Sequence, residues 1–212
     1  MIDLPASTRV NRFVPKEKFY SKTTMSPKLR QQFTDEIEKI TWTNKISPDT
    51  LNITAGDYAE FQIFEVILKG SNISTSVLKH IDTYIPYPIL FIINRSDTSK
   101  AVISYKENAI RNQNNMKVDS YFETNWQQNL YLELKGRSVD EIYKNYLYQI
   151  APSLSQTKQT NAKEAVELSK AKQAVQSQID ALNKQIHSEL STAKKQELAR
   201  QRFELEQQRN EL

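Results

Sequence analysis

The sequence predicts one α/β to α+β domain, a mixed β-sheet with flanking helices, followed by a C-terminal long helix or helical hairpin. Three observations support this fold class. Within residues 26–150, short β-rich apolar runs alternate with amphipathic patterns of helical period. Hydrophobic residues make up 38% of the 212 residues and Gly occurs only three times, which indicates a folded chain that buries a core. Residues 163–212 contain neither Gly nor Pro and are rich in strong helix formers.

The first predicted elements are a helix over residues 25–40 and strands over residues 41–46, 51–53 and 58–69. Ser26 can cap the helix, because a serine hydroxyl accepts a hydrogen bond from a free N–H of the first turn. The strands are separated by the stretches SPD and AGD, which favour turns. The apolar residues that recur every three or four positions, and so predict a stripe that faces the core, are Leu29, Phe33, Ile37 and Ile40.

A second helix is predicted over residues 74–85, between the strand at residues 58–69 and a buried strand at residues 88–93. A helical crossover of this kind joins neighbouring parallel strands, so we expect these two strands to pair in parallel. Three further strands follow, and then a closing helix that Ser138 can cap. The strands are predicted over residues 100–107, 117–126 and 129–136, and the helix over residues 138–150.

The composition divides the chain into four parts. A basic N-terminal arm covers residues 1–30 and leads into an α/β core domain at residues 26–150. At residues 151–162 the composition turns polar and loses its aromatics, which indicates a linker. Residues 163–212 form the helical tail.

Positive charge is concentrated at the start of the chain. Residues 1–30 hold seven cations and two anions, a net +5, whereas the whole chain carries only +4. Phe13, Phe19 and Tyr20 lie among these cations, and such a mixture can grip a phosphate backbone and stack bases. DNA is therefore a candidate partner; the alternative is a solvated arm that its aromatics dock on the domain. The candidate nucleic-acid-binding residues are Arg9, Arg12, Lys16, Lys18, Lys28 and Arg30.

A heptad pattern starts in the tail and then changes frame. Apolar residues repeat every seven positions up to Ile186, but Glu189 occupies the next seam position and the later leucines follow another frame. The helix therefore either stutters or folds back near residues 188–192. We favour a hairpin, because two amphipathic arms can bury each other's stripe; the rival is a coiled coil with a second copy or another protein. The candidate partner-binding residues are Leu168, Val175, Ile179, Leu182, Ile186, Leu198 and Leu205.

Several function classes are disfavoured by what the sequence lacks. The absence of Cys removes disulfides, thiolate nucleophiles and cysteine metal sites. None of GxxxxGK, GxGxxG or GxSxG occurs, and the two histidines, His80 and His187, show no ligand spacing. We therefore expect no cofactor and assign no metal site. The longest apolar run is too short to span a bilayer, so we expect a soluble cytoplasmic protein without a membrane partner.

One strand-like stretch, residues 61–70, carries two charged side chains in an otherwise apolar run. Side chains alternate along a strand, so Glu65 and Lys69 share one face. The order of elements around this strand is similar to that of a restriction-endonuclease-like core, in which a metal-binding acid precedes an acid and a lysine on the next strand. Asp49, Glu65 and Lys69 are therefore candidate catalytic residues: the carboxylates would hold Mg²⁺ and the lysine would stabilise charge on a phosphate.

The spacing of this set departs from the usual nuclease pattern. The acid and the lysine are expected two residues apart, whereas Ile67 fills that position and Lys69 lies four residues after Glu65. The alternative is structural: Glu65 and Lys69 form an ion pair at the rim of the sheet, or Glu65 meets an arginine of the basic arm.

A series of strings occurs in order along nearly the whole chain: MIDLP, VNRFVPKEKFY, SPDTLNI, QIFEVILK, IDTYIPYPILFII, ISYKE, YFETNW and, in the tail, LNKQI to FELEQQ. Together they resemble the bacterial and archaeal family called domain of unknown function 4391. The resemblance implies a context, because members of that family tend to be encoded beside helicases and DNA methyltransferases in restriction-like or phage-defence clusters. It implies no reaction.

Three functions remain open from the sequence. The leading expectation is a non-catalytic accessory subunit that docks on a helicase or methyltransferase through its C-terminal helices. The second is a divergent Mg²⁺-dependent nuclease that uses Asp49, Glu65 and Lys69. The third is a self-associating scaffold that does not contact DNA.

Overall fold

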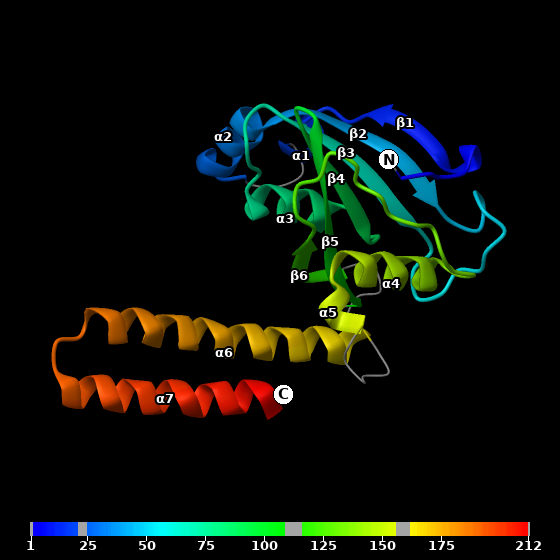
Figure 1. Ribbon diagram of the computed structural model, residues 1–212. Coiled ribbons are helices and arrows are strands. Elements are labelled where there is room, and N and C mark those ends of the chain that lie inside the picture. The colour runs from blue at the N-terminus through cyan, green and yellow to red at the C-terminus, as the bar shows by residue number, and fades with distance from the viewer. Residues whose placement is uncertain (1, 21–24, 109–115, 156–161, 212) are drawn as a thin grey trace. The chain divides into compact units, whose positions relative to one another are not determined.

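The computed structural model describes residues 2–20, 25–108, 116–155 and 162–211. The chain divides into two compact units, Met1–Pro152 and Ser153–Leu212. The first is a mixed α/β domain and the second is helical (Figure 1). The predicted fold class, a mixed sheet with flanking helices followed by C-terminal helices, is confirmed.

A six-stranded sheet forms the centre of the first unit, and its strands follow the chain order β1-β2-β3-β4-β5-β6. The pair β3 and β4 is parallel and every other neighbouring pair is antiparallel. Helix α3 makes the crossover between the parallel strands, which confirms the parallel pairing expected from the sequence. The strands are β1 (Arg9–Phe13), β2 (Ile37–Ile46), β3 (Phe61–Leu68), β4 (Ile89–Arg95), β5 (Thr98–Asn108) and β6 (Met116–Glu123).

Helices cover both faces of this sheet, and the alternation of side chains along β3 shows which helix lies on which face. Phe64 and Val66 belong to the core cluster that α2 and α3 complete. Phe61 points to the other face and stacks on Tyr146 of α4, with ring centroids 5.6 Å apart. The helical elements are η1 (Ala6–Thr8), α1 (Glu17–Tyr20), α2 (Pro27–Glu36), α3 (Thr75–Tyr84), α4 (Val139–Ile150) and α5 (Pro152–Ser155).

Two of these helices begin at the serines that the sequence indicates. Ser26 accepts a hydrogen bond from the Leu29 N–H, and Ser138 accepts one from the Glu141 N–H, each at 3.2 Å. These bonds satisfy first-turn donors that have no partner inside the helix. Both predicted caps are confirmed.

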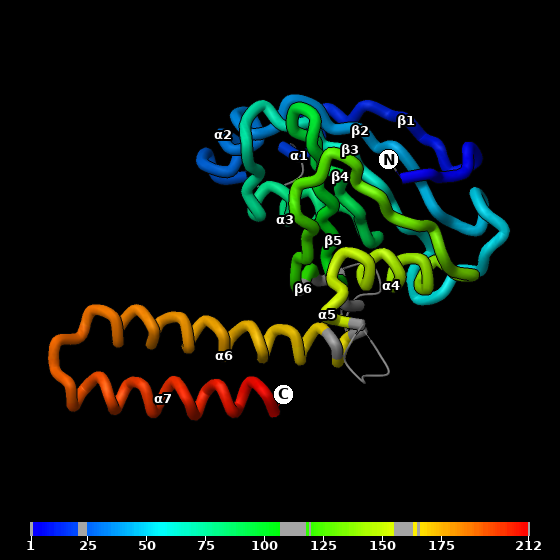
Figure 2. The backbone as a smooth tube through the Cα atoms, viewed as in Figure 1, coloured from blue at the N-terminus to red at the C-terminus, as the bar shows by residue number. Residues whose placement is uncertain are grey.

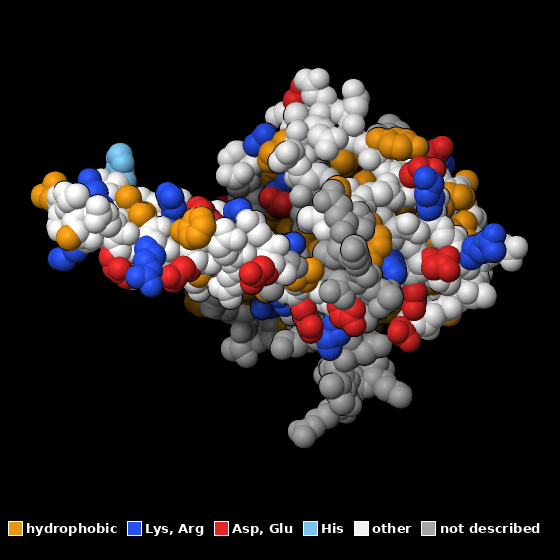
Figure 3. Space-filling view, turned by 60° about the horizontal axis from the view of Figure 1, so that its bottom comes forward, with side chains coloured by type: hydrophobic (Ala, Val, Ile, Leu, Met, Phe, Trp, Pro, Cys, Tyr) orange, Lys and Arg blue, Asp and Glu red, His pale blue; other side chains and the backbone are white. Residues whose placement is uncertain are grey.

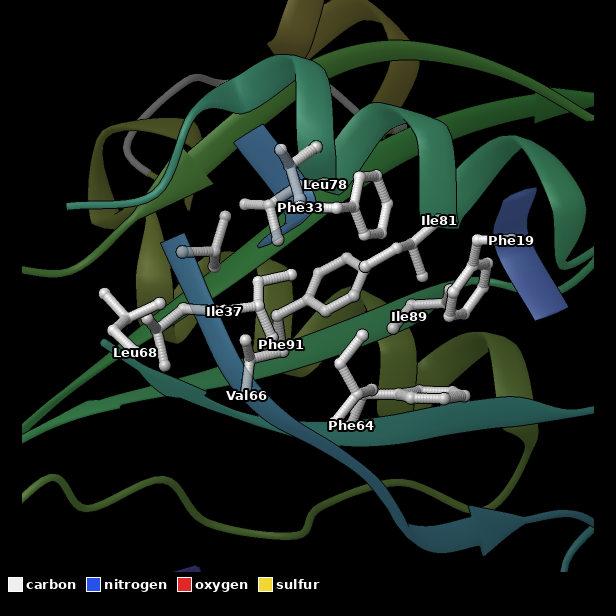
Figure 4. Packing of buried hydrophobic residues seen from close by; sticks show 14 residues of the cluster. Phe19, Phe33, Ile37, Phe64, Val66, Leu68, Leu78, Ile81, Ile89 and Phe91 are labelled. Carbon is white, nitrogen blue, oxygen red and sulfur yellow. The ribbon is translucent and has the colours of Figure 1, made fainter. Parts of the chain in front are cut away.

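The main hydrophobic core lies between the sheet and helices α2 and α3. Phe33 of α2 is fully buried among side chains from α1, α3 and the strands, and Figure 4 shows it beside Phe91 and Leu78. Its ring contacts those of Phe19 and His80, with centroids 6.0 and 5.6 Å away. The cluster therefore ties the basic N-terminal segment, both helices and the sheet into one packed unit.

The first helix is shorter than predicted. It ends at Glu36, and Ile37 and Ile40 belong to β2, where they lie opposite Leu68 and Val66 of β3. The helical spacing of these isoleucines is real, but pairing with β3 buries both of them completely and supplies backbone hydrogen bonds as well. The continuous-helix prediction over residues 25–40 is therefore wrong after residue 36.

Two predicted strands are absent among the described residues. Residues 51–53 form a turn, in which the Ile53 N–H donates to the carbonyl of Leu51 at 2.9 Å. Residues 129–136 have strand-like alternation, with buried Leu130 and Leu132, but they join no strand. The side chain of Gln149 on α4 instead bonds both the N–H and the carbonyl of Glu133, at 2.8 and 2.9 Å. A helix side chain thus takes the place of a neighbouring strand.

The basic segment contributes to the folded unit. Residues 9–13 form β1, which is the edge strand of the sheet and pairs with β2. Phe19 of α1 is buried in the main core. In the predicted linker, α5 occupies Pro152–Ser155, and residues 156–161 lie outside the described residues.

The second unit is a helical hairpin. Helices α6 (Ala162–Ser188) and α7 (Thr192–Glu211) run antiparallel, and the break falls where the heptad frame changes (Figure 2). Hydrogen bonds between the helices include one from Arg209 to Gln176 at 2.6 Å and one from Arg202 to Asn183 at 3.3 Å. None of the helices that the structure describes is long and apolar enough to cross a membrane.

The raised pKa values of three buried tyrosines predict how the stability of the fold responds to alkaline pH. Burial raises the pKa of Tyr121, Tyr143 and Tyr146. The folded state therefore keeps three protons that the unfolded state releases above about pH 10, so the free energy of unfolding falls as the pH rises through that range. Lys106 and Lys16 act in the opposite direction because burial lowers the pKa of each, but they are two groups against three.

We expect an alkaline titration to show a late, steep rise in tyrosinate absorbance that coincides with the loss of circular dichroism. Gradual ionisation of all tyrosines before any loss of structure would contradict the prediction.

Candidate functional site

The three candidate catalytic residues lie at different places along the β2–β3 ladder. Glu65 is in the middle of β3, opposite Thr41. Asp49 lies beyond the far end of β2, since Ile46 is already opposite Phe61 and thus about 13 Å from Glu65 along the strand. Lys69 follows the opposite end of β3, about another 13 Å away. The structure does not bring the three together.

Each of these side chains has its own partner. Lys69 donates from Nζ to the carbonyl of Thr34 at the end of α2, at 2.8 Å. The carboxylate of Asp49 is 86% exposed and lies 3.9 Å from Lys45. Neither residue forms an ion pair with Glu65 in the described part of the chain, so the structural pairing of Glu65 with Lys69 is absent as well.

Glu65 lies in a polar hollow on the α4 face of the sheet. Asn94 of β4 donates to Oε1 of Glu65 at 2.6 Å, and the Ser99 hydroxyl donates to Oδ1 of Asn94 at 2.7 Å. This chain of bonds explains how a carboxylate is kept in a mostly buried strand. An amide donates a hydrogen bond to it, and the open hollow of about 440 Å³ leaves it accessible to water. The hollow is lined by Ile2, Leu4, Thr43, Asn44, Ile63, Glu65, Ile92, Asn94, Ser99, Gln128, Asn129 and Leu130.

The chemistry of this hollow is limited. Among the residues that the structure describes, Glu65 is the only acid that lines it, and no lysine lines it. Within the described ranges, no cluster of three or more His, Asp and Glu side chains is placed to hold a metal ion. The hollow therefore presents a single carboxylate, whereas the predicted Mg²⁺ site needs a second acid and a lysine.

A different site lies on the opposite face of β3, beside α3. It is a groove of about 370 Å³ whose described lining includes cations and aromatic rings but no acidic side chain. We call it the cation–aromatic groove. Its lining residues are Arg12, Phe13, Val14, Lys18, Phe19, Trp42, Gln62, Phe64, Tyr84, Ile85, Pro86 and Tyr87.

The aromatic walls of this groove are held in place from behind. Trp42 donates from its indole N–H to the carbonyl of Asn44 at 3.0 Å and stacks on Phe64 with planes 8° apart. Tyr84 packs edge-on against His80, with centroids 4.9 Å apart, and His80 is bonded through Nε2 to the carbonyl of Phe19 at 3.0 Å. The rings are therefore pre-organised before any ligand arrives.

A buried ion pair anchors the loop that carries Tyr87. Nζ of Lys106 lies 2.8 Å from Oδ1 of Asp82, and both side chains are completely buried. The same ammonium donates to the carbonyls of Asp82, Ile85 and Tyr87 at 2.9, 2.8 and 2.6 Å. It thus satisfies carbonyls at the C-terminal end of α3 that have no partner within the helix, and it fixes the 85–87 turn.

The electrostatics of this pair combine two opposing effects. Burial lowers the pKa of Lys106, and the adjacent Asp82 carboxylate partly opposes that shift. Tyr121 donates its hydroxyl to Oδ2 of Asp82 at 2.7 Å, while Oδ1 faces the Lys106 ammonium in the ion pair. Burial, and then the charge of Asp82, raise the pKa of Tyr121. The group is a closed structural network rather than an open reactive centre.

The six predicted nucleic-acid-binding cations separate into three sets. Arg12 and Lys18 line the groove. Lys16 donates to the carbonyl of Ile37, and its pKa is lowered by burial and by the nearby charge of Lys69. Arg30 stacks over the ring of Tyr20, 5.0 Å from its centroid. Arg9 and Lys28 are exposed outside the groove.

The candidate partner-binding residues lie on the facing stripes of the hairpin. Val175 and Ile179 are buried, and the other five, Leu168, Leu182, Ile186, Leu198 and Leu205, are half-buried. An open seam of about 540 Å³ remains between α6 and α7, with Leu182 and Leu205 on its two sides. Leu190 and Phe203 are largely exposed. Figure 3 shows such hydrophobic side chains among charged ones on the surface of the two helices.

Sequence reasoning missed the network of Lys106, Asp82 and Tyr121 and the role of Trp42. The only local signals were a lysine inside the apolar strand sequence AVISYKE and an aspartate that follows Leu78 by one helical turn. Neither indicates the other, because β5 and α3 meet only in the folded domain.

The fold and these surfaces define a mixed α/β domain with a cation–aromatic groove, joined to a helical hairpin. The chain belongs to the family described as Domain of unknown function (DUF4391), whose family model matches residues 2–212. No match was found among curated proteins or among solved structures. The similarity to a restriction-endonuclease-like core thus stays a prediction.

Proposed function

We propose that this protein is a non-catalytic accessory subunit of a bacterial DNA-processing assembly of the restriction-like or phage-defence kind. The observation that carries the proposal is the separation of Asp49, Glu65 and Lys69 along the β2–β3 ladder, each with a different bonding environment. A metal-dependent nuclease needs its acids within reach of one ion, about 2 Å from each ligand oxygen. A helicase or methyltransferase as partner follows from the genetic context that the family resemblance implies.

The helical hairpin supports a role in protein contact. Five apolar residues of its facing stripes are only half-buried, and Phe203 is 57% exposed on α7. Two helices alone leave a seam open that a third helix would close by burying Leu182 and Leu205 further. An amphipathic helix of the partner is the occupant of matching chemistry.

The absence of catalysis is tested by a cleavage assay on plasmid and single-stranded DNA with Mg²⁺ or Mn²⁺. We expect no cleavage by the folded native protein, and no difference between it and Glu65→Ala. Cleavage that needs metal and disappears in both Glu65→Ala and Lys69→Ala would overturn the proposal and establish a nuclease.

The accessory role is tested by co-elution with the purified helicase or methyltransferase encoded beside the gene. We expect a complex with native protein that Ala181→Glu weakens, because Ala181 is exposed on the wall of the open seam and a carboxylate there cannot be buried against an apolar helix face without cost. Gln207→Glu, which adds the same charge at an exposed position of α7 that does not line the seam, is the matched control and should leave the complex intact. A complex that tolerates both changes places the contact outside this surface.

A further inference from the structure

We infer that the cation–aromatic groove is a binding site for single-stranded nucleic acid. The inference rests on the proposed function, since it names the ligand that the accessory subunit would bind in a DNA-processing assembly. The first observation is the positive charge of the groove and of the N-terminal segment. Arg12 and Lys18 line the groove and are exposed, none of its described lining residues is acidic, and the first 30 residues carry a net +5. A polyanion is thus the complementary ligand.

The aromatic lining selects the form of that polyanion. Trp42, Tyr84 and Tyr87 are half-buried, so each ring leaves part of its surface accessible. In a duplex the flat faces of the bases are stacked on one another, whereas unpaired bases can stack on protein rings. A groove with cations at its edge and rings on its walls therefore suits one strand, with the phosphates at Arg12 and Lys18 and the bases against the rings.

The support behind the rings is what separates this groove from a chance hollow. Trp42 is held by the Asn44 carbonyl and by Phe64, Tyr84 by His80, and the Tyr87 backbone by the buried ammonium of Lys106. Ordering these side chains costs little on binding because they are already ordered. Stacking on ring faces is tolerant of sequence, so we expect little base preference.

Fluorescence anisotropy with labelled oligothymidine and oligouridine of about 16 nucleotides, the upper end of typical site sizes, tests the inference. We expect both to bind more tightly than a duplex of equal length, and the tighter of the two identifies DNA or RNA as the natural strand. Tyr87→Ala should weaken binding by about 5- to 150-fold through the loss of one stacked base. Replacing Arg12 and Lys18 together with Gln should reduce the slope of log K against log salt by about 1.4, because each phosphate contact contributes about 0.7.

A matched control lies on the other face of the sheet. Lys144 of α4 lies over the ring of Tyr148, 5.6 Å from its centroid, so Lys144→Gln removes a cation beside an aromatic ring outside the groove. We expect that variant to bind like the native protein. Thermal unfolding of every variant must match the native protein before affinities are compared.

Trp42 provides a direct readout of stacking. The chain has two tryptophans, so Trp126→Phe leaves Trp42 as the only indole reporter. Oligothymidine should quench its fluorescence with the same midpoint as the anisotropy, and a chain of glutamate residues should not. Equal quenching by polyglutamate would overturn the inference in favour of an acidic protein segment.

The outcomes separate this inference from the proposed function. If oligonucleotides do not bind, or if Lys144→Gln weakens binding as much as the groove variants do, the groove inference is overturned. An intact partner complex and no cleavage would still support the accessory role in that case. Metal-dependent cleavage would overturn the accessory role whatever the groove binds.

Discussion

Lys106→Met is expected to lower the free energy of unfolding by about 3–5 kcal/mol, because it leaves a buried carboxylate without its counter-charge. Methionine keeps most of the volume of the lysine side chain, so the change tests the charge rather than the packing. It also removes the donor that serves the carbonyls of Asp82, Ile85 and Tyr87. Urea unfolding followed by tryptophan fluorescence measures the effect, since Trp42 and Trp126 both lie in the α/β unit.

The same strand supplies the control for this prediction. Lys100 of β5 pairs with Glu123 at 2.7 Å, but that carboxylate is 58% exposed. Lys100→Met should therefore cost about 1 kcal/mol or less, because water screens the pair. Adding Asp82→Leu to Lys106→Met should recover part of the loss by removing the unpaired charge. If Lys106→Met and Lys100→Met lowered the free energy of unfolding equally, burial of the Lys106 pair would contribute nothing to stability.

Phe33→Ala is expected to destabilise the α/β unit by about 3–5 kcal/mol. The ring is fully buried and lies within 6.0 Å, centroid to centroid, of Phe19, Tyr20 and His80. Its removal leaves a cavity where the N-terminal segment, α2 and α3 meet, and three aromatic neighbours cannot collapse into that space without losing their own contacts.

Phe13→Ala provides the comparison within the same unit. Phe13 is 57% exposed, and its truncation should change the free energy of unfolding by no more than about 0.5 kcal/mol. Urea unfolding of both variants checks the pair. A loss for Phe33→Ala as small as that for Phe13→Ala would mean that the core at Phe33 is less tightly packed than the structure has it.

The β3 strand explains why the candidate catalytic set is hard to judge from sequence. Alternation correctly places Glu65 on the face opposite Phe64 and Val66. It cannot reveal that Asn94 of the neighbouring strand bonds the carboxylate, since that contact depends on the parallel register of β3 and β4. A charged residue in an apolar strand therefore had the same local signature whether its partner was a metal, a lysine or an amide.

The sequence by itself determined the features that depend on neighbours in the chain. The caps at Ser26 and Ser138, the crossover helix α3 and the break between α6 and α7 all follow from local chemistry: a hydroxyl beside free N–H groups, helical periodicity, and a change of heptad frame. Their energies are local, so a short window of residues contains the information needed.

Only the tertiary structure decided the features that depend on distant partners. Ile37 and Ile40 suit a helix face, yet they become strand residues because β3 buries them and bonds their backbone. Lys106 becomes an anchor for the groove because folding brings it to Asp82, 24 residues away in the chain. Burial and pairing with distant residues outweigh local propensity at these positions, and they exist only once the sheet and α3 are packed together.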